Sequence, residues 1–207
     1  MTDVNVAIVY YSATGTLHAM AQRLTKAAEA AGGTVRLRQV PELAPEEAIA
    51  ANQAWSQHYD ETKDEPKATA DDVVWADVVL FGTPTRYGNV ASQLKQFIDT
   101  LGPQWQQGLL ADKVYAGFTA SQTAHGGQES TLLALYNTIY HFGGLVVAPG
   151  YTDALKFADG NPYGVSHVTG ANNDAPISDE VAAALDHLAQ RTVRIAGQLR
   201  DGRPEAA

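Results

Sequence analysis

Short apolar runs alternate with amphipathic stretches from the start of this chain. Residues 6–10 form an apolar run whose length and β-branched content are typical of a buried strand. After a turn of small residues, apolar positions recur with the spacing of one helix face, at Leu17, Met20, Ala21, Leu24, Ala27, Ala28 and Ala31. Two glycines at 32–33 mark the end of that helix, and residues 34–39 alternate as a second strand.

The alternation continues through the rest of the chain. Apolar runs at 77–81, 114–119 and 145–148 predict further buried strands. Helical spacing predicts helices over 71–75, 91–100 and 128–140, and a last helix that begins near Ser178. That last helix carries an apolar stripe at Val181, Leu185, Leu188, Thr192, Ile195 and Leu199.

Two long stretches interrupt this pattern. Residues 41–70 are rich in charges and poor in hydrophobic side chains, and we expect one helical turn there, around residues 46–55. Residues 149–177 form a second irregular stretch. Connections of this length in a compact domain tend to be functional or to lie at an interface. We interpret both as insertions in a single domain that spans residues 1–207.

Apolar strands that alternate with helices predict an α/β fold, in which a parallel sheet is covered on both faces. With about five strands and right-handed crossovers, we expect a doubly wound, flavodoxin-like sheet of strand order 2-1-3-4-5 in a three-layer α/β/α sandwich. Ligands of such sheets bind beyond the carboxyl ends of the strands. The unusual loops after the first, third and fourth strands all fall at that edge, which therefore is the expected binding site.

The loop after the first strand has the residues of an anion site. A helix start offers unpaired N–H groups and a partial positive charge, and the hydroxyls of Ser12, Thr14 and Thr16 add donors. The alternative is that these hydroxyls only cap the helix, with Thr16 as the N-cap. The chain has no G-x-x-x-x-G-K-[ST] motif and no G-x-G-x-x-G after this strand, so P-loop and dinucleotide-binding sites are disfavoured. A cradle for a phosphate monoester remains.

Composition narrows the chemistry further. The net charge of −9 argues against nonspecific binding of nucleic acid. Cysteine is absent, so redox chemistry would need a bound cofactor. The histidines lack metal-ligand spacing, and no metal is expected. No apolar run reaches the length of a membrane span and no leader pattern opens the chain, which makes the cytoplasm the expected location.

Four motifs together resemble one family. They are Y-Y-S-A-T-G-T-L at 10–17, F-G-T-P-T-R-Y-G-N-V at 81–90, S-Q-T-A-H-G-G-Q-E at 121–129 and N-P-Y-G-V-S at 161–166. They resemble the WrbA family of flavodoxin-like FMN proteins, which are NAD(P)H:quinone oxidoreductases. The likeness extends over nearly the whole chain, and the second motif is its most specific part.

The resemblance implies which residues bind FMN and substrates. The three loops would hold FMN through Ser12, Ala13, Thr14, Gly15, Thr16, Leu17, Pro84, Thr85, Arg86, Tyr87, Gly88, Asn89, Ser121, Gln122, Thr123, Ala124, His125, Gly126 and Gly127. Thr14, Trp105 and His141 would contact NADH or NADPH and a quinone. His141 would act from a neighbouring subunit or the cavity rim, as a hydrogen-bond or proton donor to the quinone. The family is typically homotetrameric.

Single residues also have simpler interpretations, and some depart from the family pattern. Arg86 could form a surface salt bridge, Trp105 could pack in the core, and His141 could cap its helix. Thr14 stands where the family commonly has an aromatic residue and His125 where it has a glycine, which bears on nicotinamide affinity and substrate preference. Phe142 stands where the family often repeats His.

The sequence therefore predicts a two-electron, ping-pong reduction of quinones by NAD(P)H with FMN as the cofactor. Two alternatives come from other classes of protein. One is a flavodoxin-type one-electron carrier, whose acidic surface would meet a redox partner. The other is a noncatalytic interaction protein that uses FMN only for stability.

Overall fold

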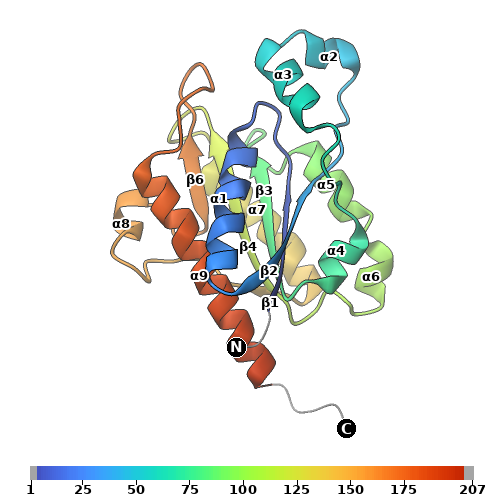
Figure 1. The fold of residues 1–207 in the computed structure, drawn as a ribbon, viewed down its shortest axis with the longest axis vertical. Helices are drawn as coiled ribbons and strands as arrows, with labels where there is room; N and C mark the ends of the chain where they lie inside the picture. Colours follow the sequence, from blue (N-terminus) through green and yellow to red (C-terminus); the bar gives the residue numbers. More distant parts are fainter. Residues whose placement is uncertain (1–3, 203–207) are drawn as a thin grey trace.

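A parallel sheet runs through the middle of the molecule (Figure 1). The computed structural model describes residues 4–202. The strands are β1 (Val4–Tyr10), β2 (Gly33–Gln39), β3 (Val78–Pro84), β4 (Val114–Ser121), β5 (Leu145–Val146) and β6 (Val165–Val168). Their order is β2-β1-β3-β4-β5, with every pairing parallel and β6 also paired with β4. The predicted order is confirmed.

Helices cover both faces of this sheet, as predicted. The helices of the described residues are α1 (Thr16–Ala30), α2 (Glu46–Ala50), α3 (Gln53–Thr62), α4 (Ala70–Trp75), α5 (Ser92–Asp99), α6 (Gly102–Gln106), α7 (Gln128–Phe142), α8 (Lys156–Asp159) and α9 (Asp179–Asp201). Helices α1 and α9 pack on one face, and α4, α5 and α7 pack on the other (Figure 1). Figure 1 also shows α2 and α3 at the end of the sheet where α1 begins.

Alternation along β1 explains why the sheet is buried on both sides. Val6 and Ile8 point into the core under α1 and α9, whereas Ala7 and Val9 point into the core under α4, α5 and α7. All four side chains are fully buried. A strand that is apolar on both faces has no solvent side, so it must lie inside a three-layer fold.

The fifth strand differs from the prediction, because the second insertion splits it. Strand β5 ends at Val146 rather than at residue 148, and β6, which lies within the insertion, resumes the pairing with β4. A tight approach at Gly164 allows this return, since a Cβ there would lie 2.3 Å from the Gly117 carbonyl oxygen on β4. Only glycine fits so close to a neighbouring backbone.

The first insertion is more regular than the sequence predicts. It forms two helices, α2 and α3, in place of one turn near 46–55. Asn52 separates them, because its side chain accepts a hydrogen bond from the Trp55 N–H and so starts a new helix. Pro103 and Trp105 lie in the short helix α6.

Candidate functional site

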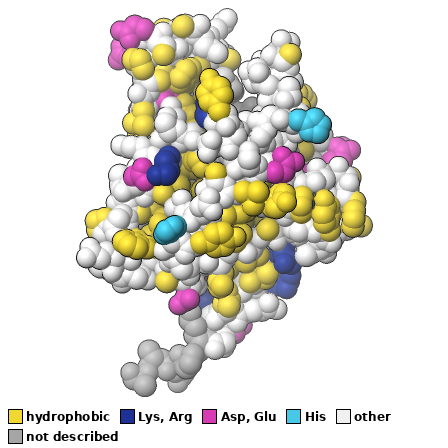
Figure 2. All heavy atoms as spheres, turned by 180° about the vertical axis from the view of Figure 1, so that it is seen from behind, with side chains coloured by type: hydrophobic (Ala, Val, Ile, Leu, Met, Phe, Trp, Pro, Cys, Tyr) yellow, Lys and Arg dark blue, Asp and Glu magenta, His cyan; other side chains and the backbone are white. Residues whose placement is uncertain are grey.

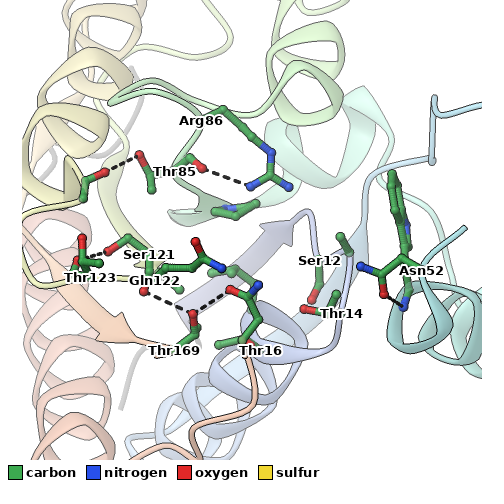
Figure 3. A pocket seen from close by; sticks show the side chains of 17 residues that line it. Ser12, Thr14, Thr16, Asn52, Thr85, Arg86, Ser121, Gln122, Thr123 and Thr169 are labelled. Atoms are coloured by element: carbon green, nitrogen blue, oxygen red, sulfur yellow. Dashed lines mark hydrogen bonds between the residues drawn. The ribbon is translucent and has the colours of Figure 1, made fainter. Parts of the chain in front are cut away.

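A cavity of about 460 Å³ opens at the carboxyl ends of the strands (Figure 3). The loops after β1, β3, β4 and β6 contribute to it, together with the start of α3. Its lining residues are Ser12, Ala13, Thr14, Thr16, Leu17, Asn52, Trp55, Pro84, Thr85, Arg86, Ala120, Ser121, Gln122, Thr123, Gly126, Thr169 and Asn173. The three predicted loops therefore do meet at one site.

The loop after β1 leaves the start of α1 open to the cavity. Gly15 takes the N-cap position with a left-handed φ of 98°, a conformation that favours glycine. No side chain caps this helix, and Thr16 is its first residue, so the alternative of Thr16 as the N-cap is wrong. The Ser12 hydroxyl accepts a hydrogen bond from the Gly15 N–H over 3.1 Å and orders the turn. The first N–H groups of α1 and the hydroxyls of Thr14 and Thr16 are thus available to an anion.

Only the first residues of the loop after β3 line the cavity. Arg86 and Asn89 exchange backbone hydrogen bonds, and Tyr87 and Gly88 between them both have positive φ. This is a type I′ turn, which projects its central residues away from the strand. Tyr87 is consequently fully exposed, and Tyr87, Gly88 and Asn89 do not line the cavity. Thr85 and Arg86 do line it.

Close packing of backbones joins this turn to the loop after β4. A Cβ at Gly127 would lie 2.8 Å from the Gly88 Cα, and the φ of Gly127 is 90°. The Thr85 hydroxyl bonds that of Thr131 over 2.7 Å and so ties the turn to α7. Ser121, Gln122, Thr123 and Gly126 line the cavity, whereas Ala124, His125 and Gly127 do not. His125 is exposed.

The two insertions supply wall residues that sequence reasoning missed. Asn52 and Trp55 come from the start of α3, and Thr169 and Asn173 follow β6. No sequence motif predicts a role for Thr169. Its hydroxyl donates to the Asn173 side chain over 2.9 Å and so closes the loop beside the cavity. The length of the insertions was the one available signal, because long connections are often functional.

The Glu42 carboxylate helps to hold the first insertion against the rest of the fold. Glu42 accepts hydrogen bonds from the Trp55 indole, the Tyr11 hydroxyl and the Gln93 amide over 2.8–3.0 Å. It also accepts hydrogen bonds from the backbone N–H groups of the next two residues, Leu43 and Ala44. Burial alone would raise the pKa of the Glu42 carboxyl, but these hydrogen bonds together hold it below its usual range.

The site fits FMN. A phosphate monoester matches an uncapped helix start flanked by hydroxyls, and Gly15 keeps that turn open. The cavity volume lies within the range of cofactor sites, about 300–1,000 Å³. Beyond the helix start, the space between the β3 and β4 loops offers backbone groups and small side chains rather than a charged cluster, which suits a flat, neutral ring system.

Comparison with known proteins agrees with this fit. The family described as NADPH-dependent FMN reductase matches residues 5–157. The chain belongs to this family. A Deinococcus radiodurans protein named NAD(P)H dehydrogenase (quinone) is 44% identical over 197 residues, which cover 95% of this chain and 97% of that protein. A Sinorhizobium fredii protein of the same name is 40% identical over 203 residues, with coverage of 95% and 98%. A solved structure of a flavodoxin, WrbA-like protein from Agrobacterium tumefaciens matches with a TM-score of 0.66 at 24% identity, and covers 95% of this chain and 99% of that one.

For this FMN reductase family member, the predicted resemblance and flavodoxin-like fold are confirmed. FMN and a nicotinamide donor are confirmed at the level of the family. Within residues 4–202, no helix has the length and apolar character that crossing a membrane requires. The same residues hold no cluster of three His, Asp or Glu side chains suited to a metal, and the absence of a metal stays a prediction.

Trp105 and His141 lie away from the cavity of this family member. They line a separate pocket of about 360 Å³, where the Trp105 indole donates to the His141 carbonyl oxygen over 2.7 Å. His141 is near the end of α7, which has 15 residues and begins beside the cavity. At a rise of ~1.5 Å per residue, the two ends of α7 are about 20 Å apart. The structure therefore does not bring His141 to the cavity rim of its own chain, and a contribution from a neighbouring subunit stays a prediction.

Proposed function

We propose that this protein is an FMN-dependent NAD(P)H:quinone oxidoreductase that works by a ping-pong route. The observation that carries the proposal is one continuous cavity, which joins an uncapped helix start to the walls formed by the β3 and β4 loops. The names of the relatives support a nicotinamide donor and a quinone acceptor. When bound, FMN supplies the chemistry, because it accepts a hydride from NAD(P)H and passes two electrons on to the quinone.

The residues of the chain hold and orient the reactants. Thr14, Thr16 and the first N–H groups of α1 would hold the phosphate, since they are the donors at the uncapped helix start. Backbone N–H groups after β4 would stabilise negative charge on the ring, by the same electrostatics as an oxyanion hole. Arg86 lies at the opposite side of the cavity from Thr16 and adds one positive charge there (Figure 3).

The shape of the site supports the proposed order of substrates. The described residues place the three FMN loops around one cavity, so NAD(P)H and the quinone would use the same space above the ring. The oxidised nicotinamide must then leave before the quinone enters. This is a ping-pong order.

The predicted homotetramer belongs to the same proposal. Figure 2 shows hydrophobic side chains in a broken band across the face opposite to that of Figure 1. Exposed hydrophobic residues from the helices of that face include Trp105, Leu133 and Tyr140. In this proposal, a neighbouring subunit that packs there would supply its own Trp105 and His141 to the FMN cavity of this chain. Location in the cytoplasm stays a prediction.

Steady-state kinetics tests the proposed reaction. Under anaerobic conditions, FMN-loaded protein should oxidise a single equivalent of NADH or NADPH per flavin without quinone, and should turn over repeatedly only when a benzoquinone is present. Double-reciprocal plots at several quinone concentrations should be parallel. Intersecting lines would overturn the ping-pong order while leaving the activity. If neither nucleotide is oxidised, the enzyme proposal fails and the one-electron carrier becomes the better explanation.

Binding of FMN and riboflavin tests the phosphate site separately, because riboflavin lacks the phosphate. Quenching of flavin fluorescence should show tighter binding of FMN, and Thr16→Ala should weaken FMN binding about tenfold while leaving riboflavin unchanged. Thr25→Ala is the matched control, because Thr25 lies on the same helix and its hydroxyl donates to the Ala21 carbonyl oxygen, away from the cavity lining. Equal loss for both flavins in T16A would show that Thr16 does not contact the phosphate.

A further inference from the structure

Trp55 stands between two pockets. It lines the main cavity of about 460 Å³ and also a neighbouring pocket of about 180 Å³. The two pockets share Ser12, Ala13 and Trp55 and no other residue. Because the indole borders both spaces, its position decides how far the main cavity extends away from the β3 and β4 loops.

Two hydrogen bonds hold Trp55 at opposite ends. Its indole N–H donates to the Glu42 carboxylate over 3.0 Å, and its backbone N–H donates to the Asn52 side chain over 3.1 Å. Glu42 is itself tied to the sheet by Tyr11 and to α5 by Gln93. A side chain that is restrained in this way presents a fixed aromatic surface, at little further entropic cost on binding.

This surface lies across the cavity from the loop after β4. Figure 3 shows Asn52, at the start of α3, on one side of the cavity and Ser121, Gln122 and Thr123 on the other, with Ser12 and Thr14 between them. The three loops assigned to FMN account for the phosphate end and for the β3 and β4 sides. The insertion therefore adds a wall on a side that those loops leave open.

We infer that Trp55 is the stacking wall for the ring of the second substrate, the quinone, with Glu42 as its positioning residue. The inference rests on the proposed function, since it needs a quinone to enter after the nicotinamide has left. Aromatic faces attract other π systems in offset stacks, and an electron-poor quinone ring suits an electron-rich indole. The indole is partly buried and held from behind by Glu42, so its exposed surface is free to meet a ring.

Equilibrium binding without turnover tests this assignment. Oxidised, FMN-loaded protein is titrated with tetramethyl-1,4-benzoquinone by calorimetry, in the absence of any reductant. The full substitution of this quinone prevents addition of lysine amines, and the chain has no cysteine to react. Trp55→Leu should raise the quinone dissociation constant about three- to tenfold, and Trp55→Phe should raise it less. The dissociation constant of FMN should stay within about twofold of the wild-type value.

Tyr59→Leu is the matched control, because Tyr59 lies on the same helix, one turn on, and lines only the smaller pocket. It should leave quinone binding unchanged. Glu42→Ala should weaken quinone binding as Trp55→Leu does, and Glu42→Gln should restore part of the loss, since an amide oxygen still accepts from the indole. A general loss of structure would lower FMN affinity in these variants as well.

The outcomes distinguish a failure of the role assigned to Trp55 from a failure of the proposed quinone oxidoreductase function. Equal quinone binding by wild-type protein and W55L overturns the role of Trp55 and leaves the proposed function intact. A larger loss of FMN than of quinone in W55L also overturns it, because Trp55 would then contact the flavin. Wild-type protein that binds no quinone in its oxidised form overturns the assignment of Trp55. The proposed function itself fails only if steady-state kinetics shows no quinone-dependent oxidation of NADH or NADPH.

Discussion

The two sides of the cavity are built by different means. One side, formed by the loops after β1, β3 and β4, is shaped by glycines at positive φ and by backbones in contact, as where Gly127 meets Gly88. The remaining walls come from the two insertions, which lie on different sides of the cavity, since Thr169 donates to the Ser121 carbonyl oxygen and Asn52 lies opposite (Figure 3). Each of these is anchored by a buried or half-buried charge at a distance from the cavity, Glu42 in the first and Lys156 in the second.

The two anchors also differ from each other. Glu42 keeps its charge because several neutral donors surround it. Lys156 is fully buried against the equally buried Asp159, and donates to the Gly164 carbonyl oxygen over 3.1 Å just before β6. Burial lowers the pKa of the Lys156 ammonium, whereas contact with Asp159 favours its charged form. Loops shaped by local geometry should thus be destabilised by backbone strain. Insertions held by a charged side chain should be destabilised when that side chain or its hydrogen-bond partner is removed.

Removing one partner of the buried pair should have the largest effect. Lys156→Met should lower the free energy of unfolding by about 3–5 kcal/mol, because the Asp159 carboxylate would remain buried without its counter-charge. The double variant Lys156→Met with Asp159→Leu should recover much of that loss. Denaturant unfolding measures both.

The exposed pair Lys95–Asp99 provides the control, and Lys95→Met should cost at most about 0.5 kcal/mol. A K156M variant no less stable than K95M would show that the charge pair does not anchor the second insertion.

Backbone strain in the cavity loops should have an intermediate effect on the free energy of unfolding. Two glycines separate the cost of a left-handed backbone from the cost of a steric contact. Gly127 and Gly32 have almost the same φ, 90° and 89°, but a Cβ at Gly32 meets nothing within 4 Å. Gly32→Ala should therefore cost only the left-handed conformation, about 1–2 kcal/mol. Gly127→Ala adds the contact with the Gly88 backbone, so it should cost more and should also weaken FMN binding. Equal unfolding free energies for the two variants would mean that the loops do not depend on their close packing.

The smallest effect should be the pH dependence of the first anchor. The pKa of Glu42 is lowered in the folded protein, so its stabilisation is fully present above the unfolded value, about 4.3, and is lost as the pH falls through the folded value. Glu42→Gln has no such titration. The difference in melting temperature between wild-type protein and E42Q should thus shrink as the pH falls below about 4. A difference that stays constant down to about pH 3 would show that the ionised carboxylate contributes nothing.

Sequence reasoning succeeded where neighbours along the chain decide the structure. The burial of β1, the turn at Gly15 and the start of α1 all follow from residues within a few positions of one another. It missed the walls from the insertions, because Glu42 reaches Tyr11 across 31 positions and Gln93 across 51. It also joined residues 147 and 148 to the fifth strand, since an apolar run does not reveal that β4 pairs with two short strands.

The sequence by itself therefore determined the doubly wound sheet, the small-residue turn before α1 and the loops that meet at the carboxyl ends of the strands. Apolar periodicity and the conformational freedom of glycine act locally, and both can be recognised in a single chain. The tertiary structure alone decided that Trp55 and Thr169 line the cavity while Tyr87 and His141 do not. These positions depend on hydrogen bonds and turns that place distant segments side by side, and no short stretch of sequence specifies such partners.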